Sequence, residues 1–282
     1  MHEASGRWTS VRARPTADDD NARRACLAAF FASGAQGVHE DGLALVTHFA
    51  PSVDLAPIHQ ALTDADSGVV IETTLVADVD WAHEWKARLV AHELGVLSIV
   101  PPWLSSGRDA ARTIVIDPGM AFGTGDHATT RGVVRLLPSV IRNGDVVADL
   151  GSGSAVLSIA AAKLGAARVF AIEVDPDATD NARENVAANR VEAVVHLFEA
   201  DAAALLPLLG PVRVVLANII SSVLVDLLPL IAAALTTDGV AILSGILREE
   251  RETMIAEFTR AGWRLLQEDG EDIWWSASIA RA

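Results

Sequence analysis

Two glycine-punctuated loops in the middle of the chain carry residue types that let a backbone approach a ligand. Residues 117–130 read DPGMAFGTGDHATT, and residues 147–155 read VADLGSGSA. Glycine adopts positive φ angles and leaves space beside the backbone, so three glycines within seven residues of the first loop favour a close contact. Ordinary loop punctuation is the alternative for each loop alone. Two such loops predict one ligand held from two sides.

The second loop has the spacing of a nucleotide-binding turn between a strand and a helix. A dinucleotide fingerprint requires a third glycine five residues after Gly151, and Val156 stands there, so that fingerprint fails. A second pattern, acid-x-Gly-x-Gly-x-Gly, is matched by Asp149, Gly151 and Gly153, with Ala155 in place of the last glycine. This turn therefore predicts a cofactor other than a nicotinamide dinucleotide.

Polar residues also follow the next buried strands. Glu173 stands 22 residues after Gly151, the distance at which an acid accepts hydrogen bonds from ribose hydroxyls; a solvated acid is the alternative. Asn218 ends the strand VVLAN, and its carboxamide oxygen would orient an incoming amine toward a methyl donor; a strand-end turn is the alternative. Asp201 is expected either to accept from an adenine amino group or to cap a helix.

The histidine, serines and cysteine near or outside these loops do not complete another kind of site. His127 has no second His or Cys at metal-ligand spacing, so we expect it to shape the first loop and expect no metal. Ser152 and Ser154 lack the G-x-S-x-G context of a nucleophilic serine. Cys26 is the single cysteine, which excludes an internal disulfide and fits a reducing cytoplasm.

The elements that must position these residues alternate between apolar strands and Ala-rich helices after residue 101. This alternation predicts an α/β fold with a mainly parallel sheet covered on both faces, whose ligands bind beyond the carboxyl ends of the strands. The last two strands are too close for a helical crossover, so they predict an antiparallel terminal hairpin. We expect strands at 113–116, 145–150, 168–173, 193–198, 212–217, 239–244, 263–268 and 272–279.

The preceding residues predict a separate, smaller α+β domain. The expected order is β-α-β-β-α-β, which is the ferredoxin-like arrangement and by itself says nothing of function. Trp81 and Trp85 are four residues apart on a short predicted helix, where they would pack a seam between domains. We expect a small domain at 1–78, a linker helix and connecting strand at 79–100, and a larger α/β domain at 101–282; the resemblance described below implies substrate recognition for the first and catalysis for the last.

Composition narrows the class of protein and of partner. An apolar fraction of 51% in 282 residues supports a sizeable core, and no apolar run is long and clean enough to span a bilayer. The N-terminal residues lack the order of a signal peptide, so we expect a cytoplasmic protein with no membrane association. A net charge of −15 disfavours nucleic acid and favours a basic partner. The oligomeric state is left open.

With these motifs assembled, the chain resembles the class I S-adenosylmethionine-dependent methyltransferases, and more specifically the bacterial ribosomal protein methyltransferase A (PrmA-type) family, which methylates ribosomal protein L11. The first loop is the most family-specific signal. The resemblance also rests on DLGSGSAVL, AIEVDP, ANII and LSGIL and on the segment of Trp81 and Trp85.

The resemblance implies a Rossmann-like domain that uses S-adenosylmethionine as methyl donor. It implies that Thr130, Gly151, Glu173 and Asn218 bind this donor, and Gly153 is assigned with them as the second glycine of the turn. Asn218 would also lie close to the acceptor, a lysine ε-amine or the N-terminal α-amine of ribosomal protein L11. The small domain would present this protein substrate.

The chain departs from the family pattern at several positions. Glu173 replaces Asp and keeps the ribose acceptor, whereas Ala155 adds a methyl group where the family has glycine. The other departures are Ser152, Asp126 and Ala128. Methylation of another protein or a small-molecule amine, or a non-catalytic cofactor-binding module, are the alternatives; a nicotinamide-dependent oxidoreductase is disfavoured by Val156.

Overall fold

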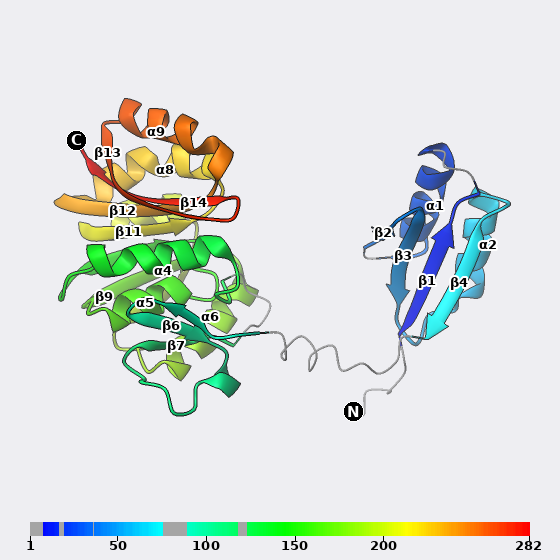
Figure 1. The fold of residues 1–282 in the computed structure, drawn as a ribbon, viewed down its shortest axis with the longest axis horizontal. Helices are drawn as coiled ribbons and strands as arrows, with labels where there is room; N and C mark the ends of the chain where they lie inside the picture. The colour runs from blue at the N-terminus through cyan, green and yellow to red at the C-terminus, as the bar shows by residue number, and fades with distance from the viewer. Residues whose placement is uncertain (1–7, 17–19, 36, 76–88, 118–122) are drawn as a thin grey trace. The chain divides into compact units, whose positions relative to one another are not determined.

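The chain forms two compact units, which are described separately. The computed structural model describes residues 8–16, 20–35, 37–75, 89–117 and 123–282 (Figure 1). The units are Met1–Arg88 and Leu89–Ala282, so residues 89–100 belong with the second unit. The predicted helix with Trp81 and Trp85 lies outside the described residues. The separate roles expected of 1–78, 79–100 and 101–282 stay predictions.

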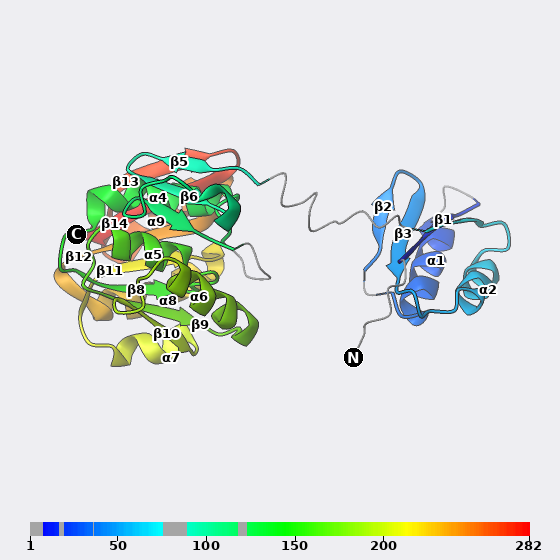
Figure 2. The ribbon, with the colours of Figure 1, turned by 90° about the horizontal axis from the view of Figure 1, so that it is seen from below.

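The N-terminal unit is a four-stranded antiparallel sheet covered by two helices. The strand order is β2-β3-β1-β4, which confirms the predicted ferredoxin-like arrangement. Alternate residues of the first strand are buried, and Val11 and Ala13 pack with Phe30, Leu45 and Leu62 in the core of this unit. Its elements are β1 (Thr9–Arg14), α1 (Asp20–Ala32), β2 (His39–Asp41), β3 (Ala44–Phe49), α2 (Ala56–Ala65) and β4 (Val70–Leu75) (Figure 2).

The second unit is built on a seven-stranded sheet of order β10-β9-β8-β11-β12-β14-β13. The pairs from β10 to β12 are parallel, and β14 pairs antiparallel with both β12 and β13. This confirms the mainly parallel sheet and the terminal hairpin. The strands are β8 (Val146–Leu150), β9 (Arg168–Glu173), β10 (Val195–Glu199), β11 (Val212–Asn218), β12 (Leu235–Leu247), β13 (Trp263–Glu271) and β14 (Trp274–Arg281).

Helices cover both faces of this sheet because its strands are apolar on both sides. Val147 and Leu216 pack under one helical layer, whereas their neighbours Ala148 and Ala217 pack under the other. The first layer consists of α4 (Ala128–Val140), α5 (Val156–Lys163) and α6 (Pro176–Ala188). The second contains α8 (Ser221–Ala234) and α9 (Arg251–Arg260), and the short α7 (Ala202–Leu205) follows β10 (Figure 1).

One strand of the second unit is not where we predicted it. The strand expected at 113–116 is β7 (Thr113–Val115), which pairs parallel with β6 (Leu97–Val100) in a separate three-stranded sheet instead of joining the main sheet. β5 (His92–Leu94) completes this small sheet through an antiparallel turn at Gly95. The reason is packing: Ile99 and Ile114 bury against the α4 and α5 layer, so both strands cover helices.

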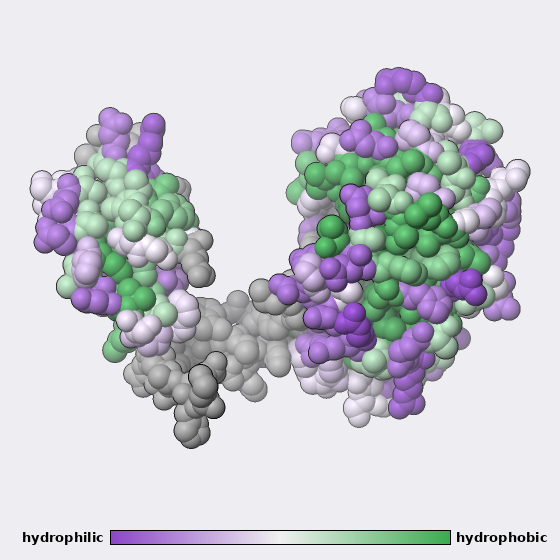
Figure 3. Space-filling model, turned by 180° about the vertical axis from the view of Figure 1, so that it is seen from behind, coloured by the Kyte–Doolittle hydropathy of each residue, from purple (hydrophilic) through white to green (hydrophobic). Residues whose placement is uncertain are grey.

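The surface of the second unit mixes polar and apolar residues, and Figure 3 shows apolar patches between hydrophilic ones on one face. Among the helices that the structure describes, none is long and apolar enough to cross a membrane. Short 3-10 turns connect elements at Pro102–Leu104, Leu206–Leu208 and Arg248–Glu250.

Candidate functional site

The second glycine loop is a tight turn that joins the end of β8 to α5. Gly151 and Gly153 have positive φ angles of 69° and 51°, so both predicted glycines occupy conformations that favour glycine. The backbone N–H groups of Gly151 and Ser152 donate to the carbonyl of Ile172 at 2.9 and 3.0 Å. Ala155 has a φ of 63° as the residue before α5, which costs a non-glycine residue about 1 kcal/mol. The turn is thus held at β9 and strained at its last position.

Asp149 lies beneath this turn and is completely buried. The Ser158 hydroxyl donates to its Oδ2 at 2.6 Å. Burial raises the pKa of Asp149 to about 7, and the bond from Ser158 opposes this rise. Within the described chain, Asp149 Oδ1 and the Ser152 hydroxyl are buried without a hydrogen-bond partner. Such atoms leave capacity for a polar ligand at the turn.

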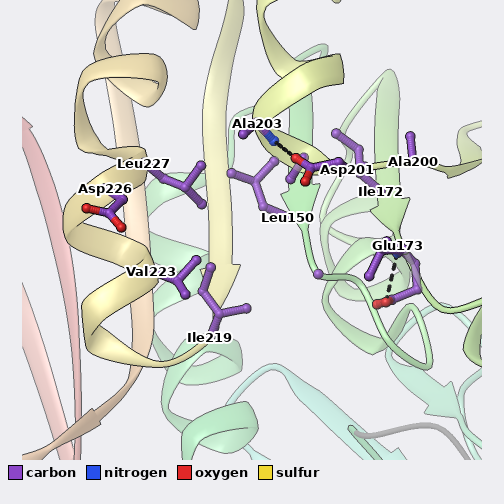
Figure 4. Close-up of a pocket in the computed structure, with 13 residues that line it drawn as sticks. Leu150, Ile172, Glu173, Ala200, Asp201, Ala203, Ile219, Val223, Asp226 and Leu227 are labelled. Carbon is purple, nitrogen blue, oxygen red and sulfur yellow. Dashed lines mark hydrogen bonds between the residues drawn. The ribbon is translucent and has the colours of Figure 1, made fainter.

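Glu173 ties the glycine turn to the end of β9. Its Oε2 accepts from Gly153 N–H at 2.8 Å, and its Oε1 accepts from Val174 and Asp175 N–H at 2.9 and 3.1 Å. Figure 4 shows the carboxylate folded back toward its own backbone. A carboxylate offers about four acceptor positions, so roughly one is left for a ligand hydroxyl. The sequence did not indicate these backbone bonds, because the longer Glu side chain makes them by curling back.

A pocket of about 310 Å³ opens beside Glu173, beyond the carboxyl ends of β8, β9 and β11 (Figure 4). Ile219, Val223 and Leu227 form an apolar wall, and Asp201 lies among the other lining residues. This is the edge of the sheet where ligands bind in open α/β folds. Asp201 Oδ1 accepts from Ala203 N–H at 2.7 Å and caps α7, which confirms the capping role and leaves an adenine contact as a prediction.

Thr130 and Asn218 meet although they are far apart in the sequence. Asn218 ends β11 and is partly exposed, whereas Thr130 is fully buried in the first turn of α4. The Asn218 amide Nδ2 donates to Thr130 Oγ1 at 3.4 Å. Because parallel strands end at one edge of the sheet, Asn218 shares that edge with Gly151. The structure therefore places all five predicted residues at one edge of the sheet.

The two glycine loops touch each other where the first loop is described. Ser154 donates its hydroxyl to the Gly123 carbonyl at 2.8 Å, and a Cβ at Gly123 would lie 2.9 Å from that hydroxyl. Asn185 of α6 joins both loops, since it accepts from Asp117 N–H at 2.9 Å and donates to the Ser154 carbonyl at 3.1 Å. Asn185 was not identified from the sequence. The signal that could have indicated it is a second asparagine, Asn189, four residues later and so on the same face of a helix; the structure shows that both are buried.

His127 shapes the first loop, as predicted. Its Nδ1 lies 2.6 Å from Thr129 Oγ1 and caps α4, and its ring meets Trp274 edge-on at 4.9 Å. Burial lowers the pKa of His127. Asp126, a departure from the family pattern, has a partner of its own, because its Oδ1 lies 2.7 Å from His92 Nε2.

Arginines of α4 connect the same loop to the terminal hairpin. Arg131 donates to the carbonyls of Gly125 and Asp126 and pairs with Glu271. Arg135 pairs with Asp269 and Glu271 at 2.5 and 2.8 Å. Over the residues covered by the structure, no three His, Cys, Asp or Glu side chains gather in a way that could hold a metal ion.

The sheet order, the terminal hairpin and a glycine turn beside a pocket at the strand ends define a class I methyltransferase fold. The family model described as ribosomal protein L11 methyltransferase (PrmA) matches residues 15–282. The chain belongs to this family.

Individual relatives agree with this assignment. The chain is 42% identical over 207 residues to the ribosomal protein L11 methyltransferase of Symbiobacterium thermophilum, and 38% identical over 201 residues to that of Carboxydothermus hydrogenoformans. These matches cover 73% and 71% of this chain but 66% and 65% of the relatives, just under two thirds of their length. A crystal structure of a ribosomal protein L11 methylase from Lactobacillus delbrueckii subsp. bulgaricus is 30% identical, with a TM-score of 0.61, over 68% of this chain and 98% of that one.

Proposed function

We propose that this protein transfers methyl groups from S-adenosylmethionine to amines of ribosomal protein L11, at lysine ε-amines, the N-terminal α-amine or both. The observation that carries the proposal is a pocket lined by Gly151 and Glu173 at the strand ends of a chain of the PrmA family. Asn218, which ends the neighbouring strand β11 and bonds to Thr130, lies at the same edge of the sheet. The names of its relatives supply the acceptor.

The residues present fit this cofactor. Asp149 Oδ1 and the Ser152 hydroxyl are buried without partners in the described part of the chain, so the turn retains capacity for a polar group. The apolar wall at Ile219 suits an adenine ring, and Glu173 retains about one acceptor position for a ribose hydroxyl. When bound, S-adenosylmethionine supplies an electrophilic methyl group on a sulfonium that leaves without acid assistance.

The residues of this chain then act by placement. A lysine amine of ordinary pKa about 10.4 must lose a proton before it attacks, which costs about 4 to 5 kcal/mol at neutral pH. Loss of water around the bound amine next to Asn218 would disfavour the charged ammonium and lower this cost. The Asn218 carboxamide oxygen accepts one N–H of the neutral amine and aims its lone pair at the methyl group, while Thr130 orients the carboxamide through its hydroxyl.

The two units divide this work in our proposal. Residues 1–78 recognise the protein substrate, 79–100 connect, and 101–282 carry the transfer. Two observations support it: the N-terminal unit has a core of its own, and the family model spans most of it. The net charge of −15 favours a basic protein acceptor over nucleic acid, and we place the reaction in the cytoplasm.

The test combines binding and transfer. Calorimetry should detect S-adenosylmethionine binding, and methyl-labelled cofactor should label purified ribosomal protein L11 but not a basic control protein of similar size. Asn218→Ala should abolish most of the label. Absence of binding would overturn the proposal as a whole. Label only on another ribosomal protein would change the acceptor, and binding with no label on any protein would make the chain a cofactor-binding module.

A further inference from the structure

The strand β12 is irregular where it passes the end of β11. Its pairing with β14 changes register between Leu243 and Ile246, so Ser244 and Gly245 form a bulge with one extra residue on β12. On its other side, Ser244 is the register partner of Asn218. Bulges near active sites change the direction of a side chain. This bulge lies directly beside Asn218, the residue that we propose orients the acceptor amine.

Ser244 uses the bulge to reach α4. It is fully buried, and its hydroxyl donates to the Thr129 carbonyl at 3.1 Å. Its oxygen also lies 2.7 Å from the Ser276 hydroxyl of β14. Since one hydroxyl has one proton, Ser276 donates to Ser244 and Ser244 donates onward to Thr129. This relay fixes the peptide immediately before Thr130.

Gly245, the second residue of the bulge, packs against the backbone of Ile219. Its φ is 84°, and a Cβ there would lie 2.3 Å from the carbonyl oxygen of Ile219, so only glycine lets the two backbones approach this closely. The Ile219 N–H also donates to the Ser244 carbonyl at 3.2 Å. Ile219 follows Asn218 directly. The same two-residue bulge therefore contacts the neighbours of both Thr130 and Asn218.

We propose that Ser244 is a positioning residue that, together with Gly245, sets the distance and orientation between Thr130 and Asn218. This inference rests on the proposed function, which gives Thr130 and Asn218 their roles. Ser244 acts through the Thr129 carbonyl, so its hydroxyl affects the reaction without contacting the reactants. A shift of about 1 Å in a reacting geometry lowers turnover by about 100-fold, so a small loss of register has a measurable effect.

Ser244→Ala is the first test, and Ser278→Ala is its matched control. Ser278 is also a buried serine, on β14, but its hydroxyl bonds to the Gln267 backbone on β13 and not to the Thr129 carbonyl. In the cofactor-free protein, Ser244→Ala should speed amide hydrogen exchange in residues 128–131 and 217–220, and the control should not. The kcat at saturating S-adenosylmethionine should fall about tenfold, as expected for the loss of one buried hydrogen bond, and the affinity for S-adenosylmethionine should change less.

A double-mutant cycle separates positioning from plain stability. In the background of Thr130→Val, which removes the hydroxyl that meets Asn218, Ser244→Ala should lower affinity and turnover much less than it does in the wild type. Additive losses, or hydrogen exchange equal to that of Ser278→Ala, would overturn the inference.

Two further measurements keep the outcome clear. If Ser244→Ala does not fold, Ser276→Ala is a milder test, because it removes the bond that holds the Ser244 hydroxyl in its orientation toward the Thr129 carbonyl. Unchanged exchange in 128–131 would then reject the relay. If Ser244→Ala speeds exchange as expected while the wild-type protein binds no S-adenosylmethionine, the proposed function is rejected and the relay stands.

Discussion

The two sides of the site are held by different kinds of bond. The glycine-turn side comprises residues 149–155 and Glu173. The Glu173 carboxylate accepts hydrogen bonds from three backbone N–H groups. On the amide side, which comprises Thr130 and Asn218, one side-chain bond of 3.4 Å joins segments from distant parts of the chain. The glycine turn is therefore fixed by hydrogen bonds to backbone N–H groups. The relative position of Thr130 and Asn218 depends instead on a side-chain bond and on the residues that hold each partner. We therefore expect changes on the first side to alter affinity and changes on the second to alter turnover.

Asn218→Ala should have the largest effect and would show whether turnover resides on the amide side. We expect kcat to fall about 100-fold or more, because the amine loses the group that orients it, while the Kd for S-adenosylmethionine rises less. Steady-state kinetics with saturating cofactor and calorimetry measure the two quantities. Asn218→Asp keeps an acceptor oxygen but loses the N–H donor to Thr130, so its kcat should lie between those of the wild type and Asn218→Ala. A near-normal kcat in Asn218→Ala would contradict the assignment of turnover to the amide side.

Asp149→Asn tests whether the glycine-turn side holds a protonated carboxyl. The unfolded carboxyl ionises near its ordinary pKa of 3.8, and the folded one near 7 because of burial. The free energy of unfolding therefore falls as pH rises from about 4 to 7 and stays lower above that range. Between pH 5 and pH 8 this amounts to about 2 to 3 kcal/mol, at about 1.4 kcal/mol per unit.

Urea unfolding at the two pH values measures this difference. Other carboxyls also titrate, so the relevant quantity is the pH dependence of the wild type minus that of Asp149→Asn. Equal pH dependence in both proteins would mean that Asp149 is ionised when folded.

Glu173→Gln should change affinity and leave turnover intact. An amide offers one oxygen where the carboxylate offers two, so at least one of the bonds to Gly153, Val174 and Asp175 is lost. We expect the Kd for S-adenosylmethionine to rise about tenfold and kcat at saturation to change less than about twofold. Glu199→Gln is the control, since Glu199 is the exposed register partner of Glu173 on β10. A fall in kcat as large as the rise in Kd would contradict the comparison.

Ala155→Gly should have the smallest effect and act on stability alone. Glycine relieves the left-handed conformation at φ 63°, and we expect a gain of about 0.5 to 1 kcal/mol in the free energy of unfolding. Ala162→Gly, within α5, should instead destabilise by a similar amount, since glycine lowers helix stability. Thermal unfolding of the three proteins measures both signs. A loss of stability in Ala155→Gly would show that its methyl group contributes more by packing than its φ angle costs.

The sequence predicted the parts of this site that depend on local pattern. The ends of the predicted strands and the glycine spacing were enough to predict that Gly151, Glu173 and Asn218 lie at one edge of the sheet. The expectation that the strand at 113–116 joins the main sheet was wrong, because strand partners depend on packing between residues that are far apart in the sequence. The bulge at Ser244 and the bonds of Glu173 to backbone were not foreseen, since both require coordinates: neither a register shift nor a curled side chain leaves a periodic signal.

The position of β14 between β12 and β13 has a consequence for the order of assembly. β12 is an open edge until residues 274–281 are available to pair with it, although β13 precedes those residues in the chain. The same strand carries Ser276, and the hairpin carries Asp269 and Glu271, the partners of Arg131 and Arg135. During synthesis, the glycine turn therefore has its strand neighbours first. The geometry at Thr130 and Asn218 is completed only when the hairpin closes, so this half of the site is the last part of it to form in the emerging chain.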